Sequence, residues 1–104
     1  MKQRLPLLLL AIAIALAGCV SKRYVKKGLK YEEAGFYELA AEMFYQIDRL
    51  DEAIKYLAAA NKLRPDEREV IVHLGNANFD SDKYEEAEKW YVAALAKKAD
   101  DINV

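Results

Sequence analysis

The 104-residue chain contains few of the side chains that enzymes most often use for catalysis. It has one histidine, His73, one cysteine, Cys19, only two serines, and no threonine. A single cysteine excludes a disulfide within one copy of the chain. A serine–histidine–acid triad needs Ser21 or Ser81 beside His73, and no motif or spacing in the sequence indicates that pairing. We therefore predict that the protein is not an enzyme.

Metal-binding patterns are also scarce. The acidic stretch DSDKYEE, which begins at Asp80, has no glycine at the centre and so differs from a calcium-binding EF-hand loop. The pairs Glu32-Glu33 and Glu85-Glu86 are adjacent, and neighbouring side chains on a helix point in different directions. Such acids are typical of a solvated helix surface. We predict neither a metal site nor a bound cofactor.

The first nineteen residues, MKQRLPLLLLAIAIALAGC, differ from the rest of the sequence. Lys2 and Arg4 are followed by an uncharged apolar run from Leu5 to Ala17. The run is short for a membrane span and has the length of the core of a secretory signal peptide. An ordinary signal peptide that happens to be followed by a cysteine is the plainer alternative.

The end of that segment, Leu16-Ala17-Gly18-Cys19, resembles the bacterial lipobox. The resemblance implies that a signal peptidase removes residues 1–18 and that the sulfur of Cys19 carries a diacylglycerol with its acyl chains. It would also explain the odd cysteine of an exported protein. Because Val20 follows the cysteine, the resemblance implies the outer membrane, facing the periplasm, in a double-membrane bacterium. In a single-membrane bacterium it implies the outer face of the plasma membrane.

Charge is unevenly distributed along the mature chain, residues 19–104, which has 14 basic and 17 acidic residues and a net charge of −3. Residues 31–104 alone have a net charge of −8, which makes nucleic acid an unsuitable partner. Five basic residues lie close to the expected anchor: Lys22, Arg23, Lys26, Lys27 and Lys30. This cluster either faces anionic lipid headgroups or is a solvated helix face, and both can hold together.

One short motif occurs twice in the sequence. DRLDEA at 48–53 and DKYEEA at 82–87 have the same residue character at every position. The offset between the two copies equals the period of the tetratricopeptide repeat, about 34 residues. Further positions recur in the same register: Leu74, Gly75, Tyr84, Ala87, Tyr91 and Ala94 in the second copy, and Leu50, Ala53, Leu57, Ala60 and Pro65 in the first. Residues 34–101 therefore resemble this family.

The resemblance implies an all-α, short helix–turn–helix solenoid after the signal peptide. We expect a lipidated tether at 19–21 and a helical domain at 22–104, with an extra helix at 22–33 and repeats at about 34–67 and 68–101. The helices are expected near 22–33, 36–47, 50–63, 67–79 and 84–97. Asp48 and Asp82 occupy the position of the turn glycine, a role that aspartate tolerates. Asp66 with Glu69 forms the pattern of a capping box.

Two alternatives remain for the first half of the domain. Gly28, Tyr31, Gly35, Tyr37, Ala40 and Phe44 fit the repeat in a different register, in which 36–47 is a second helix of a hairpin and not a first one. We expect that the two registers cannot both be satisfied. Residues 36–63 could also form one long helix, because no glycine or proline divides them.

The repeat family implies binding of a protein or peptide in a groove formed by the first helices. The positions that would face this groove are Glu38, Glu42, Tyr45, Glu69, Val72, Asn76 and Phe79. Such an acidic and aromatic surface suits a basic or amphipathic segment. Val72 stands where the carboxylate clamp of chaperone-binding relatives requires lysine, so a C-terminal carboxylate is a poor candidate. Tyr45 and Phe79 could instead simply pack against neighbouring helices.

The C-terminal end of the domain lacks an obvious capping helix. The last expected helix ends a few residues before Val104, which would leave Trp90, Tyr91 and Leu95 as uncovered apolar surface. We predict that a partner or a second copy of the chain covers this end. The two leading functions are thus a membrane-anchored binding module or assembly adaptor, and a self-associating structural lipoprotein of the envelope.

Overall fold

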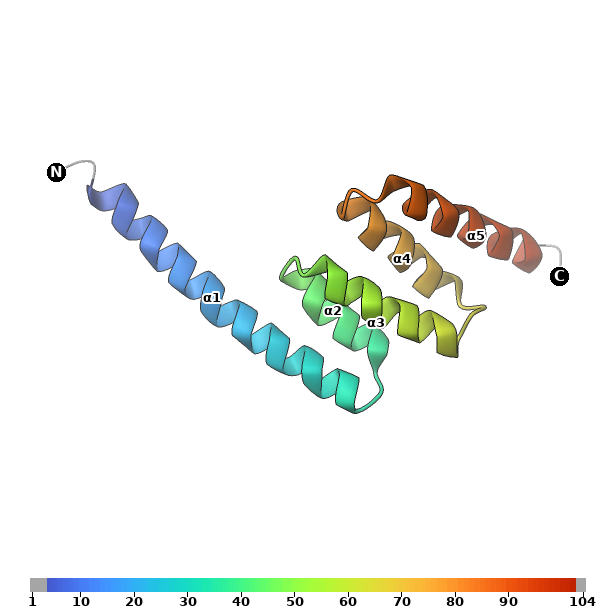
Figure 1. Ribbon diagram of the computed structural model, residues 1–104, viewed down its shortest axis with the longest axis horizontal. Helices are drawn as coiled ribbons and strands as arrows, with labels where there is room; N and C mark the ends of the chain where they lie inside the picture. The colour runs from blue at the N-terminus through green and yellow to red at the C-terminus, as the bar shows by residue number, and fades with distance from the viewer. Residues whose placement is uncertain (1–3, 103–104) are drawn as a thin grey trace.

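The computed structural model describes the backbone of residues 4–102 and the side chains of residues 8–12 and 18–98. This part of the chain is all-α, as predicted, and its long axis measures 67 Å (Figure 1). Each helix packs mainly against the next one along the chain. The helices are α1 (Arg4–Glu33), α2 (Tyr37–Gln46), α3 (Leu50–Leu63), α4 (Arg68–Asp80) and α5 (Tyr84–Ile102).

The same tight turn joins α1 to α2, α2 to α3, and α4 to α5. Each turn has one residue with positive φ: Gly35 at 83°, Asp48 at 61° and Asp82 at 63°. The following backbone N–H donates to a carbonyl five residues earlier, as in a Schellman motif, with N···O distances of 2.8–2.9 Å. The expectation for the two aspartates is confirmed, and the single helix over 36–63 is excluded.

Two helix crossings are so close that only glycine fits. A Cβ atom added to Gly28 would lie 2.7 Å from the ring of Phe44, and one added to Gly75 would lie 2.6 Å from the ring of Tyr91. In both pairs the aromatic residue follows the glycine by the same number of positions. The α1–α2 and α4–α5 hairpins are therefore equivalent units, in which Gly28 corresponds to Gly75 and Phe44 to Tyr91.

Helix α2 belongs to two hairpins at once. The ring of Phe44 contacts Gly28 on α1 and also stacks on Tyr56 of α3, with ring centroids 5.4 Å apart. Ala40 and Ala41, neighbours on α2, are both buried. Helix α2 therefore packs against the helix before it and the helix after it, and the ring of Phe44 takes part in both contacts.

A partly buried hydrogen bond ties α1 to α3. The Tyr56 hydroxyl donates to Glu32 Oε2 at 2.6 Å. Burial of the ring, the hydrogen bond and the nearby carboxylate charge together raise the pKa of Tyr56 to about 12. The apolar side of the same interface comes from Val25 and Tyr31, which pack against the core. Helix α1 is therefore part of the folded body from about Val25 onward.

Residues 19–21, the expected lipidated tether, are helical and continue α1, since no glycine or proline interrupts the helix between Cys19 and Lys27. Asp66 does not cap α4, whose N-cap residue is Glu67 and has no side-chain capping hydrogen bond. Asp66 instead accepts a hydrogen bond from Lys97 Nζ at 2.6 Å, and this contact lowers the pKa of the Asp66 carboxyl.

The close crossing predicts a cost for even one added methyl group. In Gly75→Ala the new Cβ overlaps the ring of Tyr91, which cannot swing away because its hydroxyl donates to Asn76 Oδ1 at 2.6 Å. Overpacking costs about 1–3 kcal/mol, against about 1 kcal/mol gained in helix propensity. We expect a net loss of up to about 2 kcal/mol in the free energy of unfolding, measured by denaturant titration.

A second substitution separates this overlap from other effects of the alanine. In the Tyr91→Leu background the ring is absent, so Gly75→Ala should cost nothing or stabilise the helix. An equal loss in both backgrounds would contradict the argument from close packing.

Candidate functional site

A groove of about 440 Å³ lies between α2 and α4. The buried residues Ala41 and Leu57 form its floor. One wall belongs to α2 and the other to α4, and the side chains that line these two walls are Glu38, Leu39, Glu42 and Tyr45 on α2, and Glu69, His73 and Asn76 on α4. The two walls are thus contributed by the first helices of successive hairpins.

Both ends of the groove are tied by polar contacts. At one end Glu38 Oε1 lies 3.4 Å from Arg64 Nη2, and Arg64 Nη1 also lies 3.1 Å from Glu67 Oε2. At the other end the Tyr45 hydroxyl donates to Asp80 Oδ2, which links the end of α2 to the end of α4. These contacts connect the two walls at both ends of the groove.

Two acids between these ends are exposed. Glu42 on α2 and Glu69 on α4 form no ion pair or hydrogen bond among the described side chains. Leu39, also exposed, adds an apolar patch to the α2 wall. Asn76 uses its amide oxygen as the acceptor for Tyr91 and is therefore already engaged. The groove thus combines negative charge with apolar surface.

The structure brings together five of the seven residues that were expected to face a groove: Glu38, Glu42, Tyr45, Glu69 and Asn76. The other two, Val72 and Phe79, do not line it. Val72 is half-buried, and Phe79 stacks edge-on against Tyr84 with ring centroids 5.3 Å apart. Phe79 is 53% exposed and contacts Tyr84, while Tyr45 both lines the groove and donates a hydrogen bond to Asp80.

Sequence reasoning missed Leu39 and His73 as groove residues. His73 lies four residues after Glu69 on α4, and this spacing places both side chains on one helix face. The same helical spacing rule could therefore have found it. Leu39 carried no comparable signal, because the position of an exposed leucine on a short helix depends on how α2 and α4 are placed.

Among its described side chains, α5 leaves less apolar surface exposed than the sequence suggested. Trp90 is half-buried and packs against the core, and Tyr91 covers Gly75. Leu95 is exposed, as expected, and so is Val92 one turn earlier. The uncovered apolar surface is therefore a small patch of Val92 and Leu95.

Other kinds of site have no support in the described part of the chain. Among those residues no cluster of histidine, cysteine and acidic side chains could hold a metal ion. None of the helices searched has a stretch both long and apolar enough to cross a bilayer. Cys19 is a free, exposed thiol on α1.

Comparison with known families agrees with this geometry. The model of the tetratricopeptide repeat family matches residues 33–104, more than half of the chain. The chain belongs to the tetratricopeptide repeat family. Repeats of this family generally mediate protein–protein interaction and are typically not catalytic. A search of curated proteins finds no match to this tetratricopeptide repeat chain.

Proposed function

We propose that this protein is a membrane-tethered binding module, an envelope assembly adaptor whose groove takes a basic, amphipathic segment of another protein. The observation that carries the proposal is the pair of exposed acids Glu42 and Glu69 on opposite walls of the groove. Cationic side chains of a bound helix or strand would pair with these acids. Leu39 and the ring of Tyr45 would contact its apolar side chains.

The same features argue against a ligand recognised by its C-terminal carboxylate. Arg64, the cation that contacts Glu38 at the end of the groove, is already paired with two glutamates. Val72, where a carboxylate clamp needs lysine, is apolar and half-buried. A negatively charged ligand would therefore meet uncompensated like charge.

The groove proposal predicts charge-dependent affinity for a simple probe. A designed amphipathic peptide of lysine and leucine should bind the full-length protein, and its glutamate–leucine counterpart should not. Replacing Glu42 and Glu69 together by glutamine keeps their size but removes two charges. Because each charged contact contributes about 1 kcal/mol, we expect affinity to fall by about tenfold or more. Fluorescence anisotropy of the labelled peptide measures this change.

A matched control has the same loss of charge on another surface. Glu85→Gln with Glu88→Gln changes two exposed acids of α5, neither of which lines the groove, and should leave affinity unchanged. Equal weakening by both double variants would show non-specific attraction to the acidic body and would contradict a groove site.

The tether belongs to the same proposal. It is supported by the lipobox-like residues Leu16 to Cys19 and by the exposure of the Cys19 thiol. Four apolar side chains of the preceding stretch, Leu8, Leu9, Leu10 and Ile12, are exposed, as befits a segment that is cut away or held in a membrane. We propose the outer membrane facing the periplasm as the location, or the outer face of the plasma membrane in a single-membrane bacterium.

The anchor predicts a defined mass. The intact protein extracted from membranes should begin at Cys19 and carry the mass of a diacylglycerol and its acyl chains. Cys19→Ser should accumulate uncleaved, with its leader segment attached and without lipid, whereas Ser21→Ala should be lipidated normally. Mass spectrometry of the three intact proteins shows which of them are cleaved and lipidated. A wild-type protein with a free Cys19 thiol would refute the anchor.

A second candidate function is self-association of the envelope protein through α5. The exposed Val92–Leu95 patch favours it. If a second copy covers this patch, Leu95→Glu should convert a defined oligomer into monomers, because a charge would be buried at the contact. Leu63→Glu is the matched control, since both leucines are 66% exposed. Sedimentation in mild detergent distinguishes the outcomes, and a monomeric wild-type protein would eliminate this candidate.

A further inference from the structure

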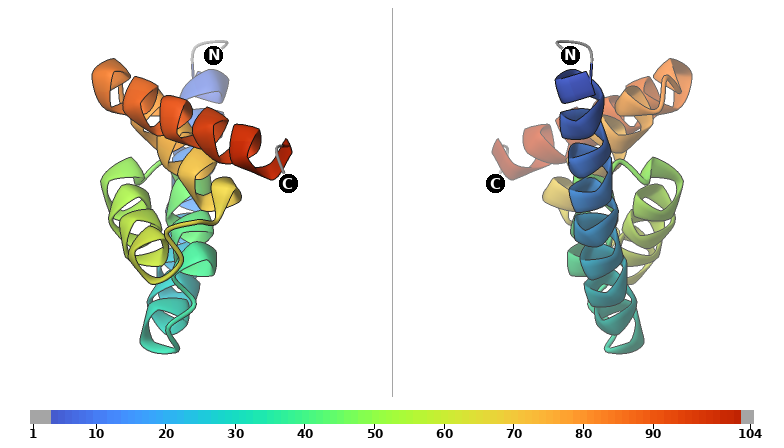
Figure 2. Two further views of the ribbon diagram at one scale, coloured as in Figure 1. Left: turned by 90° about the vertical axis from the view of Figure 1, so that its right-hand side faces the viewer. Right: turned by 90° about the vertical axis from the view of Figure 1, so that its left-hand side faces the viewer.

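The basic residues of α1 form a single stripe on the side of the helix that turns away from the body. All five cations, Lys22, Arg23, Lys26, Lys27 and Lys30, are exposed. Among the described side chains, none of the five takes part in an ion pair. The right-hand view of Figure 2 shows α1 lying in front of the other helices, with one whole side free.

Helix geometry places this stripe around the direction of Cys19. At about 100° per residue, Lys26 and Lys30 project within about 20° of Cys19, and the other three cations within about 80°. Gly28, nine residues after Cys19, projects about 180° away and packs against Phe44. The lipid-bearing sulfur and the cations therefore share one face of α1, while the body is attached to the opposite face.

The two equivalent hairpins differ at three positions of the basic stripe, which are exposed on α1 but buried on α4. The positions of α4 that correspond to Arg23, Lys27 and Lys30 are Val70, Leu74 and Ala77, which are buried in the core. In α1 the same positions carry three exposed charges. This face cannot receive another helix in the way that α4 receives α3, because three cations would have to be desolvated. An anionic surface meets no such penalty.

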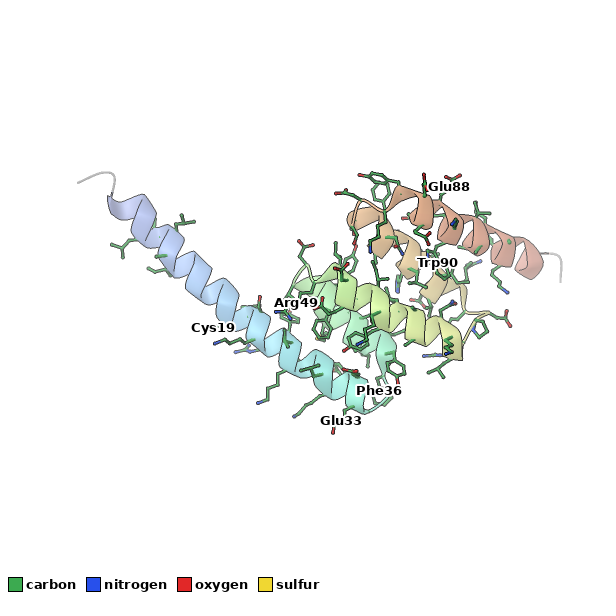
Figure 3. All side chains as sticks on the ribbon, viewed as in Figure 1. Cys19, Glu33, Phe36, Arg49, Glu88 and Trp90 are labelled. Carbon is green, nitrogen blue, oxygen red and sulfur yellow. The ribbon has the colours of Figure 1, made fainter. Side chains whose placement is uncertain are left out.

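A sixth cation comes from a distant part of the sequence. Arg49, in the turn between α2 and α3, lies beside α1 (Figure 3) and helps to line a recess of about 350 Å³. Lys22 and Lys26 lie on the same rim, and Val25 and Leu29 supply apolar surface inside it. Cations around an apolar recess match a lipid with an anionic headgroup and an acyl chain. They do not match a free phosphate, which has no apolar part.

We propose that α1 lies flat on a membrane leaflet that contains anionic phospholipid, with its basic stripe against the headgroups and the recess beside Arg49 holding a lipid. The inference rests on the proposed anchor at Cys19 and adds an orientation to it. The axis of α1 is parallel to the bilayer, and the helices α2 to α5 are held on the far side of α1, facing the aqueous phase.

The competing orientation has α1 upright. Lys22 and Lys30 are eight residues, or about 12 Å, apart along the helix axis. At about 0.1 M salt the Debye length is about 10 Å, so an upright helix would bring Lys22 close to the headgroups and leave Lys30 largely screened from them. A flat helix brings both equally close. The two orientations therefore differ in the pattern of lysine protection along α1.

The experiment is amine labelling of the full-length protein, extracted in mild detergent and reconstituted into vesicles. One vesicle is phosphatidylcholine alone, and the other is phosphatidylcholine mixed with phosphatidylglycerol. Mass spectrometry gives the labelling rate of each lysine. We expect Lys22, Lys26, Lys27 and Lys30 to react at least about fivefold more slowly in the anionic vesicles, with the protection lost at about 1 M salt. Lys62 and Lys98, exposed on the body, serve as internal controls and should not change.

Two double variants complete the test. Lys26→Gln with Lys30→Gln should release much of the protection of Lys22 and Lys27, whereas Lys62→Gln with Lys98→Gln should leave it intact. Protection that declines steadily from Lys22 to Lys30 would overturn the flat orientation. Equal labelling of α1 in the two vesicles would overturn the lipid contact. Protection that is present in both vesicles and grows with protein density would assign the stripe to a second copy instead.

The intact mass of the same samples tests the proposed lipid anchor at Cys19 separately from the proposed contact of α1 with anionic lipid. A free thiol at Cys19 would refute the lipid anchor, while the contrast between the two vesicles would still decide whether the basic stripe binds anionic lipid.

Discussion

The structure depends on how closely its helices cross. Where Gly28 meets Phe44 and where Gly75 meets Tyr91, the space between the helices excludes even a methyl group. Ala53 and Ala87, both buried, keep the corresponding second helices near their partners. Such short distances let a chain with few large aliphatic core residues bury its aromatic rings against backbone, and dispersion contacts of this kind accumulate along a stack. Each glycine crossing joins the two helices of one hairpin, α1 with α2 and α4 with α5.

The sequence predicted the parts of the fold that depend on local pattern. Asp48 and Asp82 were identifiable because the motif around the first recurs around the second, one repeat later, and a residue with positive φ has few chemical options. The pair of acids, Glu42 and Glu69, could be placed in a groove for a similar reason, since the family fixes which helix face turns inward.

The parts that could not be predicted depend on distances between remote residues. Asp66 was expected to cap α4, but Lys97, far along the chain on α5, competes for its carboxylate. Phe79 stacks edge-on against the ring of Tyr84, and this contact orients Phe79 away from the groove. Arg49 joins the basic stripe of α1 only because the α2–α3 turn returns to that helix. The periodicity of a sequence does not encode such contacts between remote residues.

The double role of α2 has a mechanical consequence. Helix α1, which carries Cys19, contacts the body mainly through α2, and α2 is also one wall of the groove. Tension applied at Cys19 therefore reaches the groove by two contacts: Gly28 with Phe44 on α2, and the hydrogen bond that Tyr56 on α3 donates to Glu32. Between Cys19 and the groove, the described chain contains no slack segment, only helices and tight turns. In the proposed arrangement, a load on a partner would be passed to the membrane along helices, with no flexible segment between.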